Sequence, residues 1–171
     1  MGTSRDERRI AGAQQFFEAA LNVAQRQQDK KIAASVHMDI GVAYGLYRRS
    51  HAGQSYKSAL AIYETEGDLY GQAMALYRLA VLGRTAQAFA DRSLALFARV
   101  LPTVEGSGKQ LDIAETFYAL CTLYRIKKQY QAALDSYNRS LAIYETLPDQ
   151  KSRVSNIQNL IRTTQRLTGT P

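Results

Sequence analysis

The chain has 171 residues, of which 46% are hydrophobic, and its 22 Lys and Arg residues against 15 Asp and Glu residues give a formal net charge of +7. This length suits one domain or a short array of repeats. No stretch approaches the roughly 18 consecutive apolar residues of a membrane span, and the single Cys121 excludes an intramolecular disulfide and a cysteine-based metal cluster. No apolar segment follows the charged residues 1–9, so we expect no signal peptide and a cytoplasmic location.

The residue pattern predicts an all-α chain. Ala, Leu, Gln, Arg and Glu, which favour helices, recur throughout, and no long run of alternating β-branched residues interrupts them. In chain order, the helices are expected at about residues 4–28, 31–48, 52–66, 68–82, 84–101, 110–127, 130–147 and 149–167.

Local signals place several of the expected helix ends. Asp68 and Asp149 are of the residue type that caps helix N-termini. Pro102 and Pro148 are expected to end the helices before them, because proline lacks the backbone N–H that continues a helix. Residues 104–108, which contain two glycines, are predicted to form the longest flexible loop.

A short segment recurs within the predicted helices. Residues 60–65 reappear unchanged as residues 141–146, an offset of 81 residues (141 minus 60). Residues 93–97 are a third, related copy, and a fourth, fainter copy begins at Ala20 and Leu21. The positions eight, four and one before the leucine of each copy hold a small, a central and a small residue, with an aromatic ring at the centre in three of the four sets. They are Ala13, Phe17 and Ala20; Ala52, Tyr56 and Ala59; Ala86, Ala90 and Ser93; and Ala133, Tyr137 and Ser140. Spacings of four and three put each set on one helical stripe, where small residues admit a neighbouring helix.

The pattern resembles the second helix of a tetratricopeptide repeat, and Tyr44, Tyr77 and Tyr124 stand where the first helix of each repeat places a tyrosine. Its longer period, near 40 residues, is similar to that of kinesin light chain repeats and of bacterial regulator repeats. The resemblance implies a right-handed superhelical stack of antiparallel helix pairs that forms a single domain over residues 1–171. It implies three full repeats near 31–66, 68–101 and 110–147, flanked by half-repeat helices at 4–28 and 149–167.

The resemblance also implies a concave groove, lined by the first helix of each repeat, that binds a peptide. Carried over position by position, the groove candidates are Met38, Val42, Arg78, Tyr118, Thr122, Arg125, Asn156 and Asn159. Arg78 and Arg125 occupy equivalent positions and are suited to clamping a carboxylate. Met38 and Val42 replace the Lys and Asn of repeats that bind chaperone tails, which argues against that subtype. The alternative interpretation is that these are solvated surface residues with no partner.

We expect a protein–protein interaction scaffold or adaptor, not an enzyme, and no cofactor or metal. His37 and His51 have no Ser, Cys or Asp arrangement beside them that would suggest a catalytic triad. The basic surface favours a partner with acidic groups, and the open ends of the stack leave homo-oligomer formation through the terminal helices as an option. Two alternatives remain: a nucleic-acid-binding accessory protein, the less favoured because no aromatics lie among the basic residues, and a self-assembling structural scaffold.

Overall fold

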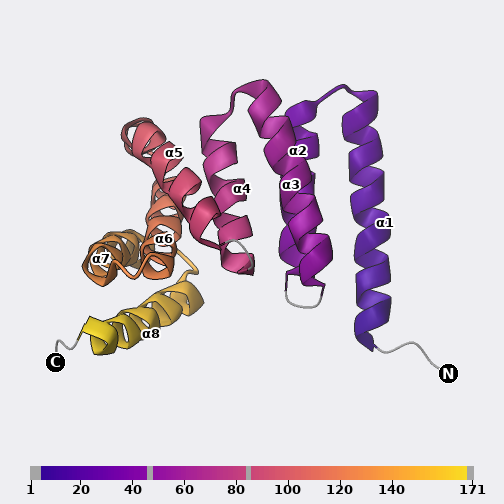
Figure 1. The fold of residues 1–171 in the computed structure, drawn as a ribbon. Coiled ribbons are helices and arrows are strands. Elements are labelled where there is room, and N and C mark those ends of the chain that lie inside the picture. Colours follow the sequence, from indigo (N-terminus) through magenta and orange to yellow (C-terminus); the bar gives the residue numbers. More distant parts are fainter. Residues whose placement is uncertain (1–4, 46–47, 84–85, 169–171) are drawn as a thin grey trace. The chain divides into compact units, whose positions relative to one another are not determined.

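A computed structural model describes residues 5–45, 48–83 and 86–168, with side chains from residue 15 onward. These residues form eight α-helices and no strand (Figure 1), so the all-α prediction is confirmed for them. The helices are α1 (Arg5–Arg26), α2 (Lys30–Tyr44), α3 (Arg49–Glu66), α4 (Leu69–Leu82), α5 (Ala86–Gly106), α6 (Gln110–Ile126), α7 (Tyr130–Thr146) and α8 (Lys151–Thr168). No described helix is long and apolar enough to cross a bilayer.

The helices pack against their neighbours in the chain, as in a helical repeat. Internal contacts divide the chain into an N-terminal unit, Met1–Ala75, and a C-terminal unit, Leu76–Pro171, which meet within α4. In the N-terminal unit, α2 packs against both α1 and α3. In the C-terminal unit, α5, α6, α7 and α8 pack in sequence, and α6 with α7 forms the most extensive pair. The boundaries 1–171 of a single repeat domain remain a prediction.

Of the two helix caps predicted from the sequence, one is confirmed and one is wrong. Asp68 caps α4, because the Gly71 backbone N–H donates a 2.9 Å hydrogen bond to Asp68 Oδ1. The prediction that Asp149 caps α8 is wrong: α8 begins at Lys151, and Asp149 lies in the preceding turn with a φ of 56°. The chain reverses directly after Pro148, and aspartate is one of the few residues that tolerate the left-handed conformation required there.

The expected end of the fifth helix is also wrong. α5 continues through Pro102 to Gly106, so most of the predicted loop at 104–108 is helical. Pro102 is exposed, and the carbonyl that loses its helical partner belongs to exposed Ala98, which water can reach. The last turn is also held from outside the helix, since Arg139 Nη2 of α7 lies 2.7 Å from Glu105 Oε1.

The core of the N-terminal unit depends on a close approach of α2 and α3. Gly41 of α2 is buried beneath the ring of Tyr56 of α3, and a Cβ added at Gly41 would lie 2.3 Å from Tyr56 Cε1. Ala52 and Ala59, one turn to either side of Tyr56, are fully buried. The small–aromatic–small stripe predicted for this helix therefore faces α2, and the glycine is required because any side chain there would occupy the place of the ring.

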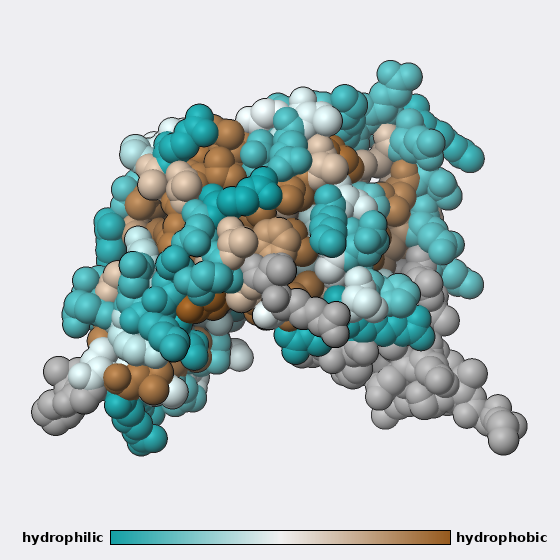
Figure 2. Space-filling model, viewed as in Figure 1, coloured by the Kyte–Doolittle hydropathy of each residue, from teal (hydrophilic) through white to brown (hydrophobic). Residues whose placement is uncertain are grey.

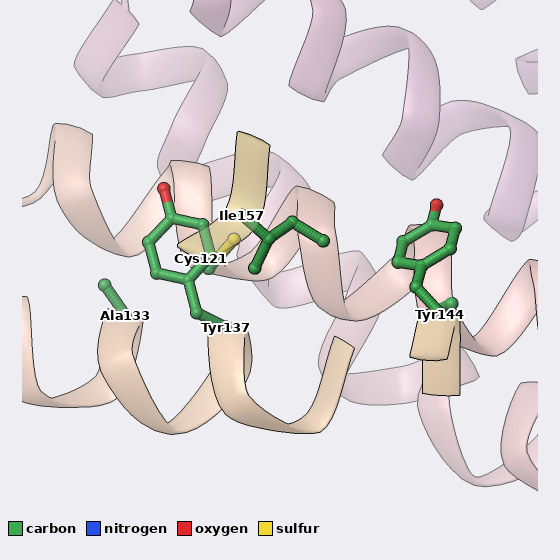
Figure 3. Close-up of a cluster of buried hydrophobic side chains, with 6 residues drawn as sticks. Cys121, Ala133, Tyr137, Tyr144 and Ile157 are labelled. Carbon is green, nitrogen blue, oxygen red and sulfur yellow. The ribbon is translucent and has the colours of Figure 1, made fainter. Parts of the chain in front are cut away.

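The core of the C-terminal unit has the same design around Tyr137 of α7. Tyr137 is fully buried and lies beside Cys121 of α6 and Ile157 of α8 (Figure 3). Ala133 and Ser140, the small residues of the predicted stripe, are also fully buried, and Ser140 Oγ donates a 2.9 Å hydrogen bond to the Ala114 carbonyl of α6. The stripe thus packs α7 onto its neighbours as the sequence predicts.

The Cys121 thiol should resist alkylation in the folded protein. It is fully buried, and burial raises its pKa to about 12, so the reactive thiolate is scarce at neutral pH. We expect native protein treated with iodoacetamide to remain unmodified by mass spectrometry, while urea-unfolded protein is labelled completely. Labelling of the native protein as fast as that of the unfolded chain would contradict the buried position.

Candidate functional site

One face of α6 carries three of the groove candidates. Tyr118, Thr122 and Arg125 are spaced by four and three residues, which places them on one stripe of the helix, and all three are half-buried. Thr122 Oγ1 donates a 3.1 Å hydrogen bond to the Tyr118 carbonyl, so the threonine side chain lies along the helix. Glu115, three residues before Tyr118, continues the stripe and is also half-buried. The stripe therefore has an acidic end and a basic end.

Arg125 is anchored to the core. Its Nη1 donates a 3.2 Å hydrogen bond to the Tyr137 hydroxyl, a contact that the sequence did not reveal. Burial raises the pKa of Tyr137 well above its ordinary value, so the hydroxyl stays neutral and accepts this bond. A guanidinium has five N–H donors, and no carboxylate of the described residues pairs with this one. Arg125 is thus held in place by Tyr137, and its guanidinium has further N–H donors beyond the one in this bond.

Arg78 of α4 is a second cation without a carboxylate partner among the described residues. Its guanidinium carbon lies 5.2 Å from the centroid of the Tyr77 ring, and its Nε is buried without a hydrogen-bond acceptor in the described part of the chain. A buried N–H without an acceptor is unfavourable. The Nε atom is closed to solvent, so a ligand oxygen would meet Arg78 through its terminal guanidinium nitrogens.

A cavity of about 400 Å³ opens beside Thr122 and Arg125. Its wall joins the end of α4 and the start of α5 to α6, α7 and α8, through residues that include Val81, Ala86, Tyr130 and Leu167. Val81 and Leu167 are 46% and 54% exposed, so this part of the apolar wall is open to solvent. The cavity thus combines an apolar wall with the Arg125 guanidinium. On the face drawn in Figure 2, hydrophilic residues surround smaller hydrophobic areas.

Of the two groove candidates on α8, one contacts the stripe of α6 and the other does not. Asn156 Nδ2 donates a 3.2 Å hydrogen bond to the Tyr118 hydroxyl, so the structure brings these two together. Asn159 Oδ1 instead accepts a 3.4 Å hydrogen bond from Arg162 of its own helix. Arg153, which sequence reasoning did not select, lies with its guanidinium carbon 5.1 Å from the Tyr118 ring centroid.

The two apolar candidates belong to the N-terminal unit. Met38 is half-buried and Val42 is 51% exposed, and their spacing of four puts them on one face of α2. Neither residue carries a charge. The structure therefore gives an apolar face here and a cationic one in the C-terminal unit.

The described residues contain no group of three or more His, Cys, Asp or Glu side chains placed to hold a metal ion. His37 is half-buried in α2, and burial lowers its pKa, which favours the neutral ring. His51 is exposed and its ring centroid lies 6.0 Å from that of Tyr44.

Comparison with known proteins finds a likeness in fold to a solved structure. No protein-family model matches the chain, and no curated protein matches it. The crystal structure of BtubC (BKLC) from P. vanneervenii is similar, with a TM-score of 0.58 and 18% sequence identity, over 98% of this chain and 85% of that chain. At this identity the likeness concerns the fold, and the chain shares with BtubC a helical, repeat-like, all-α architecture.

Proposed function

We propose that this chain is a tetratricopeptide-type interaction scaffold, without catalytic activity, that binds an acidic segment of another polypeptide along the stripe of α6. The observation that carries the proposal is the pair of half-buried arginines, Arg78 and Arg125, which have no carboxylate partner among the described residues. Charge-assisted hydrogen bonds from a guanidinium to a carboxylate are among the strongest polar contacts in proteins. An incoming carboxylate supplies the carboxylate partner that neither guanidinium has among the described residues.

The geometry around the arginines suits an extended peptide. Tyr118, Thr122 and Arg125 run along about two turns of α6, roughly 10 Å, a span covered by three extended residues. The Tyr118 and Asn156 side chains lie at the other end of this span and offer further hydrogen bonds. The cavity beside Arg125 has room for an apolar side chain next to the acidic one.

The repeat register supports the family proposal. Gly41 stands at the glycine of the tetratricopeptide pattern, and Tyr56 stands at its central aromatic position. The structure brings these two into direct contact in the N-terminal unit. Cys121 and Tyr137, at the equivalent positions of the third repeat, lie together in the core of the C-terminal unit. Both contacts are the ones that the repeat pattern requires.

Selection from a displayed library of unstructured peptides tests the function. We expect the enriched peptides to contain Asp or Glu, and we expect Arg78→Gln combined with Arg125→Gln to weaken their binding by about 2–3 kcal/mol, because two charge-assisted hydrogen bonds are lost. Fluorescence anisotropy with a labelled peptide gives the dissociation constants.

A matched control separates the stripe from general electrostatics. Arg99 and Lys57 are exposed and lie outside the candidate surface, and changing both to Gln removes the same two charges. Melting temperatures of both double variants check that the fold persists. The proposed site would be ruled out if the two double variants weakened binding equally. It would also be ruled out if neither double variant changed the affinity for the enriched peptides.

A further inference from the structure

The last helix, α8, carries positive charge without any negative charge. It contains four of the 22 Lys and Arg residues of the chain and none of the 15 Asp and Glu residues. Every other helix that has more than one Lys or Arg also contains Asp or Glu. The four cations of α8 are exposed, and none of them forms an ion pair with a carboxylate of the described residues. They are Lys151, Arg153, Arg162 and Arg166.

Three of these cations share one exposed face of α8 with neutral hydrogen-bonding side chains. Residues spaced by three and four lie on one stripe of a helix, and here the stripe consists of Lys151, Ser152, Ser155, Asn159, Arg162 and Arg166. We call it the basic stripe of α8. α7 packs on the opposite side of α8 (Figure 1), where Ile157 and Thr164 are fully buried. The basic stripe therefore faces away from the core.

The charges of the basic stripe are unfavourable for the helix itself. Lys151 is the first residue of α8, at the positive end of the helix dipole, and the first turn contains no acidic residue. Arg162 and Arg166 are four residues apart, so their like charges repel each other. A polar outer face keeps the end of a helical stack soluble, but neutral or mixed charges serve that purpose equally well. The excess of one sign indicates a partner of the opposite charge.

The side chains of the basic stripe are of the types that bind phosphate. Arg, Lys, Ser and Asn all donate hydrogen bonds to phosphate oxygens in complexes with DNA. α8 has no aromatic residue on which the bases of a single strand could stack, whereas the bases of a duplex are already stacked on each other. A membrane surface fits less well, because the stripe has no apolar side chain to insert between lipids.

The spacing of the cations suits the major groove of DNA. Lys151 and Arg162 are eleven residues apart (162 minus 151), about 16 Å along the helix, and Arg166 lies about one turn further. The major groove of B-DNA is about 12 Å wide and admits an α-helix. A helix that crosses this groove brings Lys151 to one phosphate backbone and Arg162 with Arg166 to the other. The major groove of an RNA duplex is too narrow for this arrangement.

We propose that the basic stripe of α8 binds the phosphate backbone of double-stranded DNA without reading its sequence. The contact is separate from the peptide site on α6, since neither Arg78 nor Arg125 belongs to it. Binding of cations to DNA phosphates releases counterions, so the affinity falls as the salt concentration rises. With three cations on phosphates, the affinity falls about 40-fold between about 50 and 200 mM salt.

Fluorescence anisotropy with a labelled mixed-sequence duplex of about two helical turns tests the proposal. We expect saturable binding by the full chain at about 50 mM salt and the loss of about 40-fold at 200 mM. Arg162→Gln combined with Arg166→Gln should weaken binding at least about tenfold at the lower salt concentration. The same double variant should reduce the loss caused by salt to about threefold, because one phosphate contact remains.

A matched control separates the basic stripe from the net charge of the chain. Arg99→Gln combined with Lys57→Gln removes the same two charges from exposed positions on other helices. It should leave the affinity within about threefold, since distant exposed charges are largely screened. Melting temperatures of both double variants check that the fold persists. Absence of duplex binding, an affinity that does not depend on salt, or equal weakening by the two double variants would overturn the proposal.

Competition distinguishes a duplex from other anions. The competitors are the single strand of the same sequence, vesicles of phosphatidylglycerol and polyglutamate, each compared with unlabelled duplex at equal concentration of negative charge. We expect the unlabelled duplex to displace the labelled one most effectively, because it alone offers two phosphate backbones across a groove. Equal displacement by any of the other three would show that the basic stripe recognises charge alone, and the proposal of a duplex site would be wrong.

Discussion

Replacing Tyr137 with Ala should lower the free energy of unfolding by about 3–5 kcal/mol, the range found for buried aromatic side chains. The ring is fully buried against Cys121 and Ile157, so its removal leaves a cavity between three helices. The Arg125 guanidinium also loses its acceptor. Urea denaturation followed by circular dichroism measures the effect.

Tyr137→Phe is the control for the hydroxyl. It keeps the ring and removes only the acceptor of the Arg125 hydrogen bond, so we expect a loss of about 1 kcal/mol. A loss below about 1 kcal/mol for Tyr137→Ala itself would mean that the ring is not enclosed and that the repeat register is wrong.

Replacing Gly41 with Val should destabilise the protein by about 3 kcal/mol, the upper part of the range for overpacking in a core. The new Cβ would lie 2.3 Å from Cε1 of Tyr56, and the ring is buried with only 4% exposure, so it has little freedom to withdraw. Thermal or urea unfolding monitored by circular dichroism provides the comparison.

Gly106→Val is the matched control, because a Cβ at exposed Gly106 meets nothing within 4 Å. We expect it to change stability by about 0.5 kcal/mol at most, as is usual for surface substitutions. In a Tyr56→Leu background, Gly41→Val should be less harmful, since a smaller side chain gives room. Equal costs at Gly41 and Gly106 would contradict the close packing of α2 and α3.

The repeated stripes made the core predictable. A stripe of small residues around a central aromatic ring is expected to be buried against a neighbouring helix. The structure buries Ala52, Tyr56 and Ala59 as expected. The Asp68 cap was predictable for a related reason, since it depends on a contact three residues along the chain. Features fixed by local chemistry or by a repeating pattern are therefore visible in the sequence.

Features that depend on contacts between residues far apart in the sequence could not be predicted from the sequence. The extension of α5 beyond Pro102 involves Arg139, 37 positions further along, paired with Glu105. The Arg125–Tyr137 hydrogen bond and the cavity beside Arg125 depend on how α6 meets its neighbours. Likewise, the hollow lined by α1, α2 and α3 exists only once these helices are placed together. The family resemblance predicted which residues are groove candidates, whereas their hydrogen-bond partners are seen only in the structure.

The most direct test of the central claim is to map a selected acidic peptide onto the chain by amide chemical shifts. The proposed function predicts that the largest shifts at saturation fall on α6 at Tyr118, Thr122 and Arg125, with smaller ones on α8 near Asn156. Large shifts confined to another surface, such as the exposed side of α1 around Phe16, with α6 unchanged, would contradict it.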